Sequence, residues 1–482
     1  MKPKLLMITA VWGEWHIKML LNMNLATMLA PNNLSALSEA ALVRYRIYTT
    51  EEDALKIDRA EIVSLLRNYV EVEIRVLKNV NFSDPIGTHH KVWAWGVKEA
   101  QAQNMMIMFL PPDVAWSNQS FKTIGDRLTQ GYKVIMMTYL RAEEKAFQKG
   151  IPDFPEKGHH IINLSGRELM KLCIEALHPL MAAYLKDSTH FPKHPEMMFW
   201  PVKNEGLLLR VFAREMFLFD PNRYQLNKQA LPEKKLNSEE ACFIDDSDQL
   251  FGVSLAPINA DLGWYINPQP ADAINIAHWW LIYDSPANDF LVSHKIRWHF
   301  SPITEEKWQA VEKASDRFIR KTSVLREALR IFSAARNLDC KLAAKLITYS
   351  IYTGSALFAA KQINNGMVLF LPCDKALSGK ANRYMNNFLS SKHNSKKLLN
   401  SIRAHMSKDT HLFQITNSEK GDASLIHKKS QIEMVSGQKL QITKNNGKIT
   451  IGEAQIISEP TRVGHHLVFV VDNLLISEQS FD

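Results

Sequence analysis

Two hydrophobic spacings alternate along the first 140 residues. Continuous apolar runs, typical of buried strands, occur at 4–12, 45–50, 105–110 and 131–139, and residues 70–77 alternate apolar with polar side chains. Apolar residues at helical spacing lie between them, at 15–29, 51–69 and 88–104. This order of strands and helices predicts an α/β layer with a largely parallel sheet covered on both faces.

The pattern changes further along the chain. Residues 166–185 predict one amphipathic helix, and a long helix is expected from Thr304 to about 335, with Glu305 and Glu306 favouring its first turn. Short strand-like pieces follow, with a hairpin expected around residues 445–447, which read Asn-Asn-Gly. The last third therefore predicts an α+β unit.

The net charge of +8 is unevenly placed. Residues 341–482 contain 18 Lys and Arg against 10 Asp and Glu. The whole chain has 58 Lys and Arg and 50 Asp and Glu, so residues 1–340 contain 40 of each charge. The excess is either a solvated surface or a patch for an anionic partner. Since no basic run exceeds two residues, nucleic acid is a poor candidate partner.

The spacing of the cysteines and the length of the apolar segments indicate the cellular compartment of the protein. The four cysteines are far apart, which argues against a disulfide framework or a zinc site and favours a reducing cytoplasm. The first apolar run is too short for a signal peptide, and no segment approaches the roughly 18 apolar residues of a transmembrane helix. We therefore expect a cytoplasmic protein with no transmembrane segment.

Candidate chemistry lies where the expected strands end, because ligands of a parallel sheet bind at the carboxyl ends of its strands. The dipeptides at these ends are Trp12–Gly13, Thr49–Thr50 and Pro112–Asp113. None is followed by GxGxxG or GxxxxGK[ST], so dinucleotide-binding and P-loop functions lose their main support.

Asp113 is the first of these candidates. A carboxylate after an apolar strand can bind Mg²⁺ or Mn²⁺ that bridges the diphosphate of a nucleotide sugar. Such sites usually hold a second carboxylate, and the position two residues earlier is Pro111. A turn or cap role for Asp113 is the alternative.

Each of the other polar candidates has a structural and a functional interpretation. The segment 243–248 contains Asp245, Asp246 and Asp248, which form either an acidic turn or a general base for an acceptor hydroxyl. His294 and His299 either contact a phosphate or metal or are packed structurally. Glu205 lies either in a plain polar loop or in a loop at a pocket.

The C-terminal third resembles a fasciclin domain. The family's strand "TVFAPTDAAF" is similar to "MVLFLPCDKAL" at Met367–Leu377, its "LLxYHVV" to "LLNSIRAHMSKD" with His405, and its closing "NGVIHVIDKVLLP" to "GHHLVFVVDNLLIS" at Gly464–Ser477. Cys373 stands where the family has threonine, and Ala404 where tyrosine often precedes the histidine. The resemblance implies an interaction module for a partner or polysaccharide.

The N-terminal 300 residues resemble nucleotide-diphospho-sugar transferases of the GT-A type. The likeness rests on "ITAVWGEWHIKMLL", "YRIYTTEED" and "MFLPPDVAWSN". It implies that Asp113 matches the second acidic position of the metal motif, while Pro111 departs from the first. Metal independence, or loss of activity, is therefore the alternative to a metal at Asp113. The nucleotide would lie near Val11, Trp12, Thr49 and Thr50, and Asp246 and Asp248 would be catalytic on the acceptor side.

Together these inferences predict an α/β protein with a Rossmann-like GT-A nucleotide-sugar transferase sheet, followed by an α+β fasciclin-like domain. The expected domains are residues 1–335, including the linking helix 304–335, and residues 336–482. The expected function is sugar transfer from a nucleotide-sugar donor to a hydroxyl of a glycan or protein acceptor. The alternative is a non-catalytic adhesion or scaffold protein with a degenerate transferase-like domain.

Overall fold

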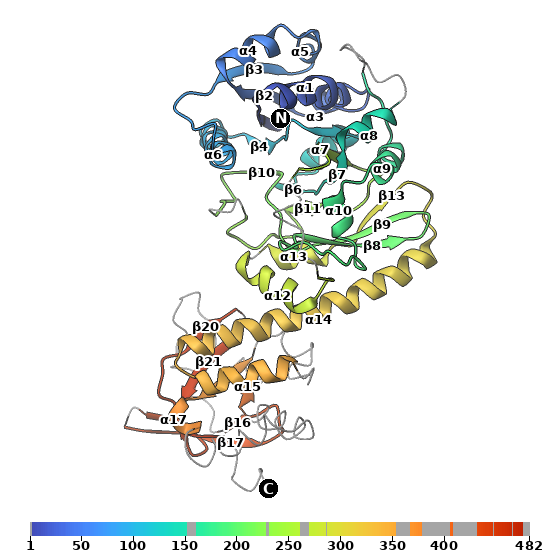
Figure 1. Cartoon of the computed structure of the whole chain (residues 1–482). Helices are drawn as coiled ribbons and strands as arrows, with labels where there is room; N and C mark the ends of the chain where they lie inside the picture. Colours follow the sequence, from blue (N-terminus) through green and yellow to red (C-terminus); the bar gives the residue numbers. More distant parts are fainter. Residues whose placement is uncertain are drawn as a thin grey trace. The chain divides into compact units, whose positions relative to one another are not determined.

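The structure is a computed structural model, and its chain divides into two compact units (Figure 1). Unit 1 comprises residues 1–271 and 282–316, and unit 2 comprises residues 272–281 and 317–482. The structure describes residues 2–151, 161–227, 231–260, 269–285, 287–352, 367–377, 405–407, 431–446, 448–464 and 466–475.

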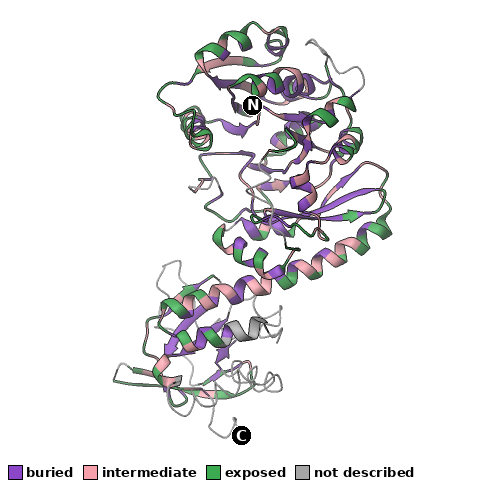
Figure 2. Cartoon of the chain, viewed as in Figure 1, coloured by how far each residue is buried: buried purple, intermediate pink, exposed green. Residues whose placement is uncertain are grey.

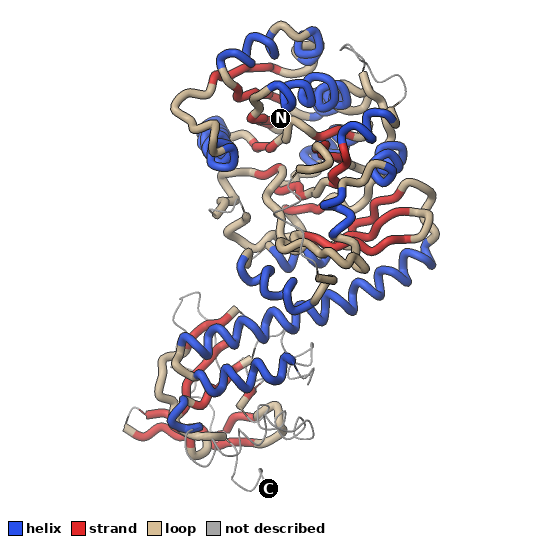
Figure 3. The backbone as a smooth tube through the Cα atoms, viewed as in Figure 1, coloured by secondary structure: helices blue, strands red, loops and turns tan. Residues whose placement is uncertain are grey.

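A seven-stranded sheet forms the centre of unit 1 (Figure 3). Its order is β11 (Ala241–Phe243), β6 (Val134–Met136), β10 (Leu218–Phe219), β4 (Met106–Phe109), β1 (Lys4–Ala10), β2 (Leu42–Thr49) and β3 (Glu71–Val76). Strand β10 runs antiparallel to its neighbours β4 and β6, and the other adjacent pairs are parallel. The sheet direction therefore places the carboxyl ends of β1, β4, β6 and β11 at one edge.

Helices connect these strands. They are α1 (Glu14–Met19), the π-helix η1 (Leu20–Asn24), α2 (Leu25–Met28), α3 (Leu34–Ala40), α4 (Glu51–Asp58), α5 (Glu61–Leu66), α6 (Pro85–Gln103) and α7 (Ser120–Thr129). Helix α6 packs against β1 and β4, and Gly96 permits this close approach. A Cβ at Gly96 would lie 2.6 Å from Ile8 Cδ1 and 3.0 Å from Ile107 Cδ1.

Two three-stranded sheets complete unit 1. One is β5 (Val114–Trp116), β12 (Gly252–Ala256) and β7 (Leu140–Glu143), and the other is β13 (Ile296–His299), β9 (Gly206–Val211) and β8 (Met197–Val202). Their strands are largely buried, as the purple strands of Figure 2 show. The remaining described helices are α8 (Glu144–Lys149), α9 (Gly166–Glu175), α10 (Pro179–Ala183) and α13 (Asn288–Ser293).

Unit 2 contains most of α12 (Ala273–Ile282), the later part of α14 (Glu305–Asn337), and α15 (Lys341–Tyr352). One sheet has the order β15 (Met406–Ser407), β14 (Val368–Pro372), β21 (His466–Val471) and β20 (Thr461–Val463). The other has the order β16 (Gln431–Glu433), β17 (Lys439–Asn445), β18 (Lys448–Ile451) and β19 (Ala454–Gln455). The short helix α17 (Asp374–Leu377) follows β14.

Strands β14 and β21 are apolar except at His466, the first residue of β21, because both faces of the pair are buried. Leu369 and Val468 face a core that includes Ala328, Ile331 and Ala335 of α14, whereas Phe370 and Phe469 face the core of the second sheet. The rings of Phe370 and Phe469 stack with centroids 5.7 Å apart. Since side chains of a strand alternate between faces, a continuous apolar run is what such a central strand requires.

The structure confirms the mixed α/β character and several predicted elements. The long helix is α14, and the hairpin is the antiparallel pair β17–β18, with Gly447 of its turn outside the described residues. The prediction of a single helix over 166–185 is wrong: α9 ends at Glu175 and α10 starts at Pro179. Proline lacks the amide donor and clashes with the preceding helical turn, so it starts a new helix here.

The two units do not test the predicted domains. Their division falls inside α14, between residues 316 and 317, while the sequence analysis placed the boundary at 335 and 336. That boundary stays a prediction.

Candidate functional site

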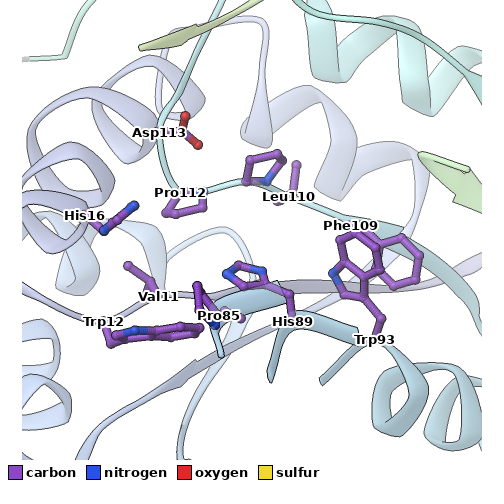
Figure 4. A pocket seen from close by; sticks show the side chains of 12 residues that line it. Val11, Trp12, His16, Pro85, His89, Trp93, Phe109, Leu110, Pro112 and Asp113 are labelled. Carbon is purple, nitrogen blue, oxygen red and sulfur yellow. The ribbon is translucent and has the colours of Figure 1, made fainter. Parts of the chain in front are cut away.

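A cavity of about 230 Å³ lies at the carboxyl ends of β1 and β4. Ala10 ends β1 and Val11 and Trp12 follow it, Leu110 to Asp113 follow β4, and α1 and α6 supply the other walls (Figure 4). From β1 the chain continues to β2 and β3 on one side, whereas β4 lies on the other side. The cavity therefore lies at the point where the strand order reverses, which is where open α/β sheets bind ligands.

The turn between β4 and β5 is held on several sides. Asn24 Nδ2, at the end of η1, donates to the carbonyls of Pro111 (3.1 Å) and Val114 (2.9 Å). Thr9 Oγ1 donates to the Leu110 carbonyl at 2.9 Å. These hydrogen bonds make the turn a well-supported wall of the cavity.

Asp113 ends this turn and is half-buried. Its Oδ2 accepts a hydrogen bond from Ser254 Oγ at 2.7 Å, and its carbonyl accepts from Leu255 N at 2.9 Å, so β12 holds both its backbone and its side chain. Asp113 caps no described helix, and among the cavity's lining residues it is the one carboxylate. Pro111 lines the same cavity.

Two histidines, which the sequence analysis did not single out, complete the polar lining. In Figure 4 Trp12 lies across the cavity from Asp113, and His16 and His89 lie between them. Desolvation lowers the pKa of both histidines, although the Asp113 charge opposes the shift in each. At neutral pH these rings are therefore mainly uncharged hydrogen-bonding groups.

The predicted nucleotide residues divide into two groups. Val11 and Trp12 line the cavity, and the Trp12 ring contacts His89 with centroids 5.1 Å apart. Thr49 and Thr50 do not line it. Thr49 is fully buried at the end of β2 and its Oγ1 lacks a hydrogen-bond partner among the described residues.

Thr50 is the N-cap of α4 and accepts from Asp53 N at 3.1 Å. Asp53 Oδ2 in turn accepts from Gly13 N at 2.9 Å. Gly13 has a φ of 82°, which favours glycine, so this chain of contacts fixes the turn that carries Trp12. Thr50 therefore does not line the cavity, but it contacts Asp53, which holds the Gly13 turn beside Trp12.

Asp246 and Asp248 form a separate cluster with His299. His299 is 1% exposed, and its Nε2 lies 3.2 Å from Asp246 Oδ1 and 3.7 Å from Asp248 Oδ2. Ligand atoms of the three residues lie within 4.8 Å of one another, close enough to share a divalent cation. Arg167 also forms an ion pair with Asp248, and its Nη2 lies 2.7 Å from Asp248 Oδ2.

This cluster is not part of the cavity lining. Asp246 follows β11, which lies three strands from β4, or roughly 14 Å at the usual strand spacing. Burial alone would raise the pKa of Asp246, but the hydrogen bond with His299 and that from Asp248 N lower it. His299 gains a raised pKa, because Asp246 and the Ser301 carbonyl outweigh its desolvation.

The other sequence candidates have structural partners. Glu205 accepts from Thr304 N (2.7 Å), Lys307 Nζ (2.6 Å) and Trp308 Nε1 (3.0 Å) at the start of α14. His294 packs against Phe243 and Phe290. Asp245 has a raised pKa because of burial.

A third group of charged residues was missed by the sequence analysis. Glu196 precedes β8, and Arg214 and Glu215 precede β10. The sequence signal is the charged pair Arg214–Glu215 between the largely apolar segments 206–212 and 216–219, and no motif marks this pair.

Comparisons with known proteins concern the C-terminal part. A model of the family "Fasciclin domain" matches residues 347–477, which confirms the predicted fasciclin domain there. The match does not extend into the residues before 347, so it leaves the GT-A resemblance without support. A search of curated proteins gave no match.

Among solved structures, the chain is similar to a FAS1 domain pair from the insect cell adhesion molecule fasciclin I. The identity is 17% and the TM-score 0.20, over 27% of this chain and 43% of that one. This chain therefore spans less than half of that structure's length.

Within unit 2, the two strand motifs form the middle of its first sheet. "VLFLP" is β14 and "HLVFVV" is β21, and the two strands pair in parallel. His405 is buried, and its Nε2 accepts from Leu475 N at 3.1 Å. Residues 398–404 and 408–409 of the middle motif lie outside the described residues. A fasciclin domain suggests an adhesion or binding module.

In the part of the chain that the structure describes, no helix is both long enough and apolar enough to cross a bilayer.

Proposed function

We propose that unit 1 is a GT-A-type glycosyltransferase, which transfers a sugar from a nucleotide-sugar donor to a hydroxyl of a glycan or protein acceptor. One observation carries the proposal: the cavity lies at the strand-order reversal of an α/β sheet, with aromatic and polar lining and one carboxylate. The fasciclin domain is proposed to bind the acceptor or an anionic partner, since residues 341–482 carry the positive excess.

The cavity suggests how the donor is held. The flat Trp12 ring suits a nucleobase, and the uncharged His16 and His89 suit ribose or phosphate oxygens. Val11 lies beside Trp12, and Thr49 and Thr50 support the same strand ends. Positioning of the donor and stabilisation of charge on its diphosphate would supply most of the rate enhancement.

Asp113 is the proposed metal ligand. Mg²⁺ is commonly bound by one or two carboxylates together with substrate phosphates, so a single carboxylate fits. Such a cation would neutralise charge on the leaving diphosphate. Because Pro111 supplies no second carboxylate, metal-independent binding of the diphosphate is the alternative.

Asp246 and Asp248 remain proposed catalytic residues on the acceptor side. They follow β11, whose carboxyl end lies at the same edge of the sheet as those of β4 and β1. His299 lies close to both carboxylates. We also propose a cytoplasmic setting, in which the four unpaired cysteines would stay reduced.

The experiment is a panel of UDP-, GDP- and CMP-sugars with Mg²⁺, Mn²⁺ or a chelator. A donor should raise the melting temperature and be hydrolysed slowly, and Asp113→Asn should lower that hydrolysis by about a hundredfold. Asp187→Asn is the matched control, because the Asp187 side chain is 92% exposed and does not line the cavity. If no donor shifts the melting temperature or is consumed, the enzyme proposal is wrong.

The second candidate function is a non-catalytic adhesion or scaffold protein. The fasciclin match and the single carboxylate at the cavity favour it. It predicts a bound glycan or protein partner in the full chain without any donor turnover, and Asp113→Asn should then leave partner binding unchanged.

A further inference from the structure

The antiparallel strand β10 brings a second charged group to the ligand-binding edge. Leu218 pairs with both Met108 of β4 and Ile135 of β6, and Phe109 N donates to the Phe217 carbonyl at 3.0 Å. Since β10 runs opposite to its neighbours, residues before Leu218 lie where β4 and β6 end. Arg214 and Glu215 therefore lie between the segment that leads to Asp113 and the segment that leads to Tyr139.

Arg214 is shared by two carboxylates. Its Nη1 lies 3.5 Å from Glu215 Oε2 and 3.7 Å from Glu196 Oε2. Its guanidinium carbon lies 5.2 Å from the centroid of the Tyr139 ring. Glu196 reaches the same place from β8, and its carbonyl accepts from Phe212 N at 2.7 Å.

Arg214 is the cation that contacts both carboxylates. Burial and, after it, the charge of Glu215 raise the pKa of Glu196, Arg214 and Arg141 oppose the shift, and the resulting pKa is about 7. Tyr139 and Tyr184 also interact electrostatically with Arg214 and raise its pKa. Near neutral pH, Glu196 can thus both accept and release a proton.

The carboxylates remain accessible to a reactant. The Glu196 side chain is 38% exposed and that of Glu215 is 44% exposed, whereas Arg214 beneath them is 20% exposed. Protein surrounds the group closely enough to desolvate Glu196, and yet solvent reaches it. A partly exposed carboxylate at this end of the sheet is accessible to an acceptor hydroxyl.

We propose that Glu196 is the general base of the transfer, positioned by Arg214 and Glu215; this rests on the proposed glycosyltransferase function. The acceptor oxygen forms a bond to the anomeric carbon of the donor as the bond from that carbon to the diphosphate oxygen breaks. The electron pair of the broken bond leaves with the diphosphate, and the acceptor's hydroxyl proton moves to the Glu196 carboxylate. Water in place of the acceptor gives donor hydrolysis by the same steps.

This assignment competes with Asp246 and Asp248 for the same role. Asp248 is engaged by Arg167, and Asp246 by His299, whose contact lowers the pKa of Asp246. A carboxylate with a lowered pKa is a weaker base than one that titrates near the working pH. Glu196 is therefore a stronger base than Asp246, and the Asp248 carboxylate is already paired with Arg167.

The test is the pH dependence of kcat/KM for donor consumption, from about pH 5 to about pH 9, in the full-length chain. Wild type should lose activity below about pH 7. Glu196→Gln should be slower by about a hundredfold or more and lack this acid limb, and Glu196→Asp should recover part of the rate.

Glu215→Gln separates a base from a merely structural group. It removes a charge that raises the pKa of Glu196, so the acid limb should move to lower pH while activity at high pH remains. Glu239→Gln, at an exposed position outside the group, is the matched control and should resemble wild type. Asp246→Asn tests the competing assignment and should keep the wild-type acid limb.

The outcomes separate the role of Glu196 from the transferase function. An active wild type whose Glu196→Gln variant keeps full rate and an unchanged acid limb overturns Glu196 as the base and leaves the transferase proposal intact. The same holds if Asp246→Asn, rather than Glu196→Gln, removes the acid limb. A wild type that consumes no donor from the panel overturns both proposals. Thermal unfolding at about pH 8 checks folding, because Glu196→Gln should not lower the melting temperature there.

Discussion

Glu196 of unit 1 and Glu327 of unit 2 are the same residue type in desolvated surroundings, yet their pKa values shift in opposite directions. Desolvation favours the neutral form of both carboxyls. Around Glu327, however, His466, Arg330 and Arg326 outweigh it and lower the pKa to about 2. At Glu196 the second carboxylate Glu215 adds to desolvation, and the pKa rises to about 7.

The contacts explain the difference. Arg330 Nη1 lies 2.8 Å from both oxygens of Glu327, Arg326 Nη2 lies 3.2 Å away, and His466 Nε2 lies 3.4 Å away. Arg214 is more than 3.4 Å from each of two competing carboxylates. The ratio of positive to negative neighbours, rather than burial, decides whether a desolvated glutamate is a structural anion or a titrating group.

The largest expected effect tests the role of Glu327 as a structural anion. Glu327→Gln should lower the free energy of unfolding by about 3 kcal/mol, because it removes the charge of a buried carboxylate that Arg326 and Arg330 both contact. Urea unfolding of the full chain, with Glu459→Gln as an exposed control, measures the change. Equal losses in the two variants would contradict the prediction.

The same residue predicts a response to acid. Since the folded-state pKa of Glu327 lies below its ordinary value, its stabilisation is present above about pH 4.5 and is lost as pH falls toward 2. Wild type should therefore lose its advantage over Glu327→Gln in that range.

The next effect concerns the binding cavity of unit 1. Trp12→Ala should weaken nucleotide-sugar binding about tenfold, or about 1.4 kcal/mol, because a base loses its aromatic platform. Isothermal titration gives Kd, and Trp95→Ala is the control, since Trp95 is 40% exposed and does not line the cavity. Unchanged affinity in Trp12→Ala would remove the nucleobase from this wall.

The smallest effect has the opposite sign to that at Glu327. With its raised pKa, Glu196 costs stability as pH rises from about 4.5 through about 7, because the unfolded chain releases its proton first. Glu196→Gln should therefore stabilise the protein above about pH 7, by less than about 1 kcal/mol because solvent screens this partly exposed group. Thermal unfolding at low and high pH should show the gain at high pH only, and destabilisation at both would give Glu196 a structural role.

Much of the fold was predictable because it depends on local spacing. The apolar runs gave β1, β2, β4 and β6, and helical spacing with Glu305 and Glu306 gave α14. Strand β10 was not predicted, because two residues carry too little periodicity to mark a strand. The helix at 166–185 was mispredicted because its apolar spacing continues across Pro179, which breaks it.

The candidate site was predictable only in part. Asp113, Val11 and Trp12 follow apolar strands and therefore lie at the carboxyl edge, as expected. Thr49 and Thr50 satisfy the same rule but do not line the cavity, because β2 is one strand away from the reversal point. His16 and His89 were missed because their helices bring them to the cavity from positions that no motif marks.

The sequence by itself determined the strand and helix alternation, the excess of positive charge after residue 340 and the fasciclin motifs, since each is a property of neighbouring residues. Only the tertiary structure decided which polar groups meet. It joined Asp246 with His299 and Glu327 with His466, and it placed Glu196, Arg214 and Glu215 together through an antiparallel strand between β4 and β6. Charges act over distances in space, so their effect on a pKa depends on contacts between residues far apart in the chain.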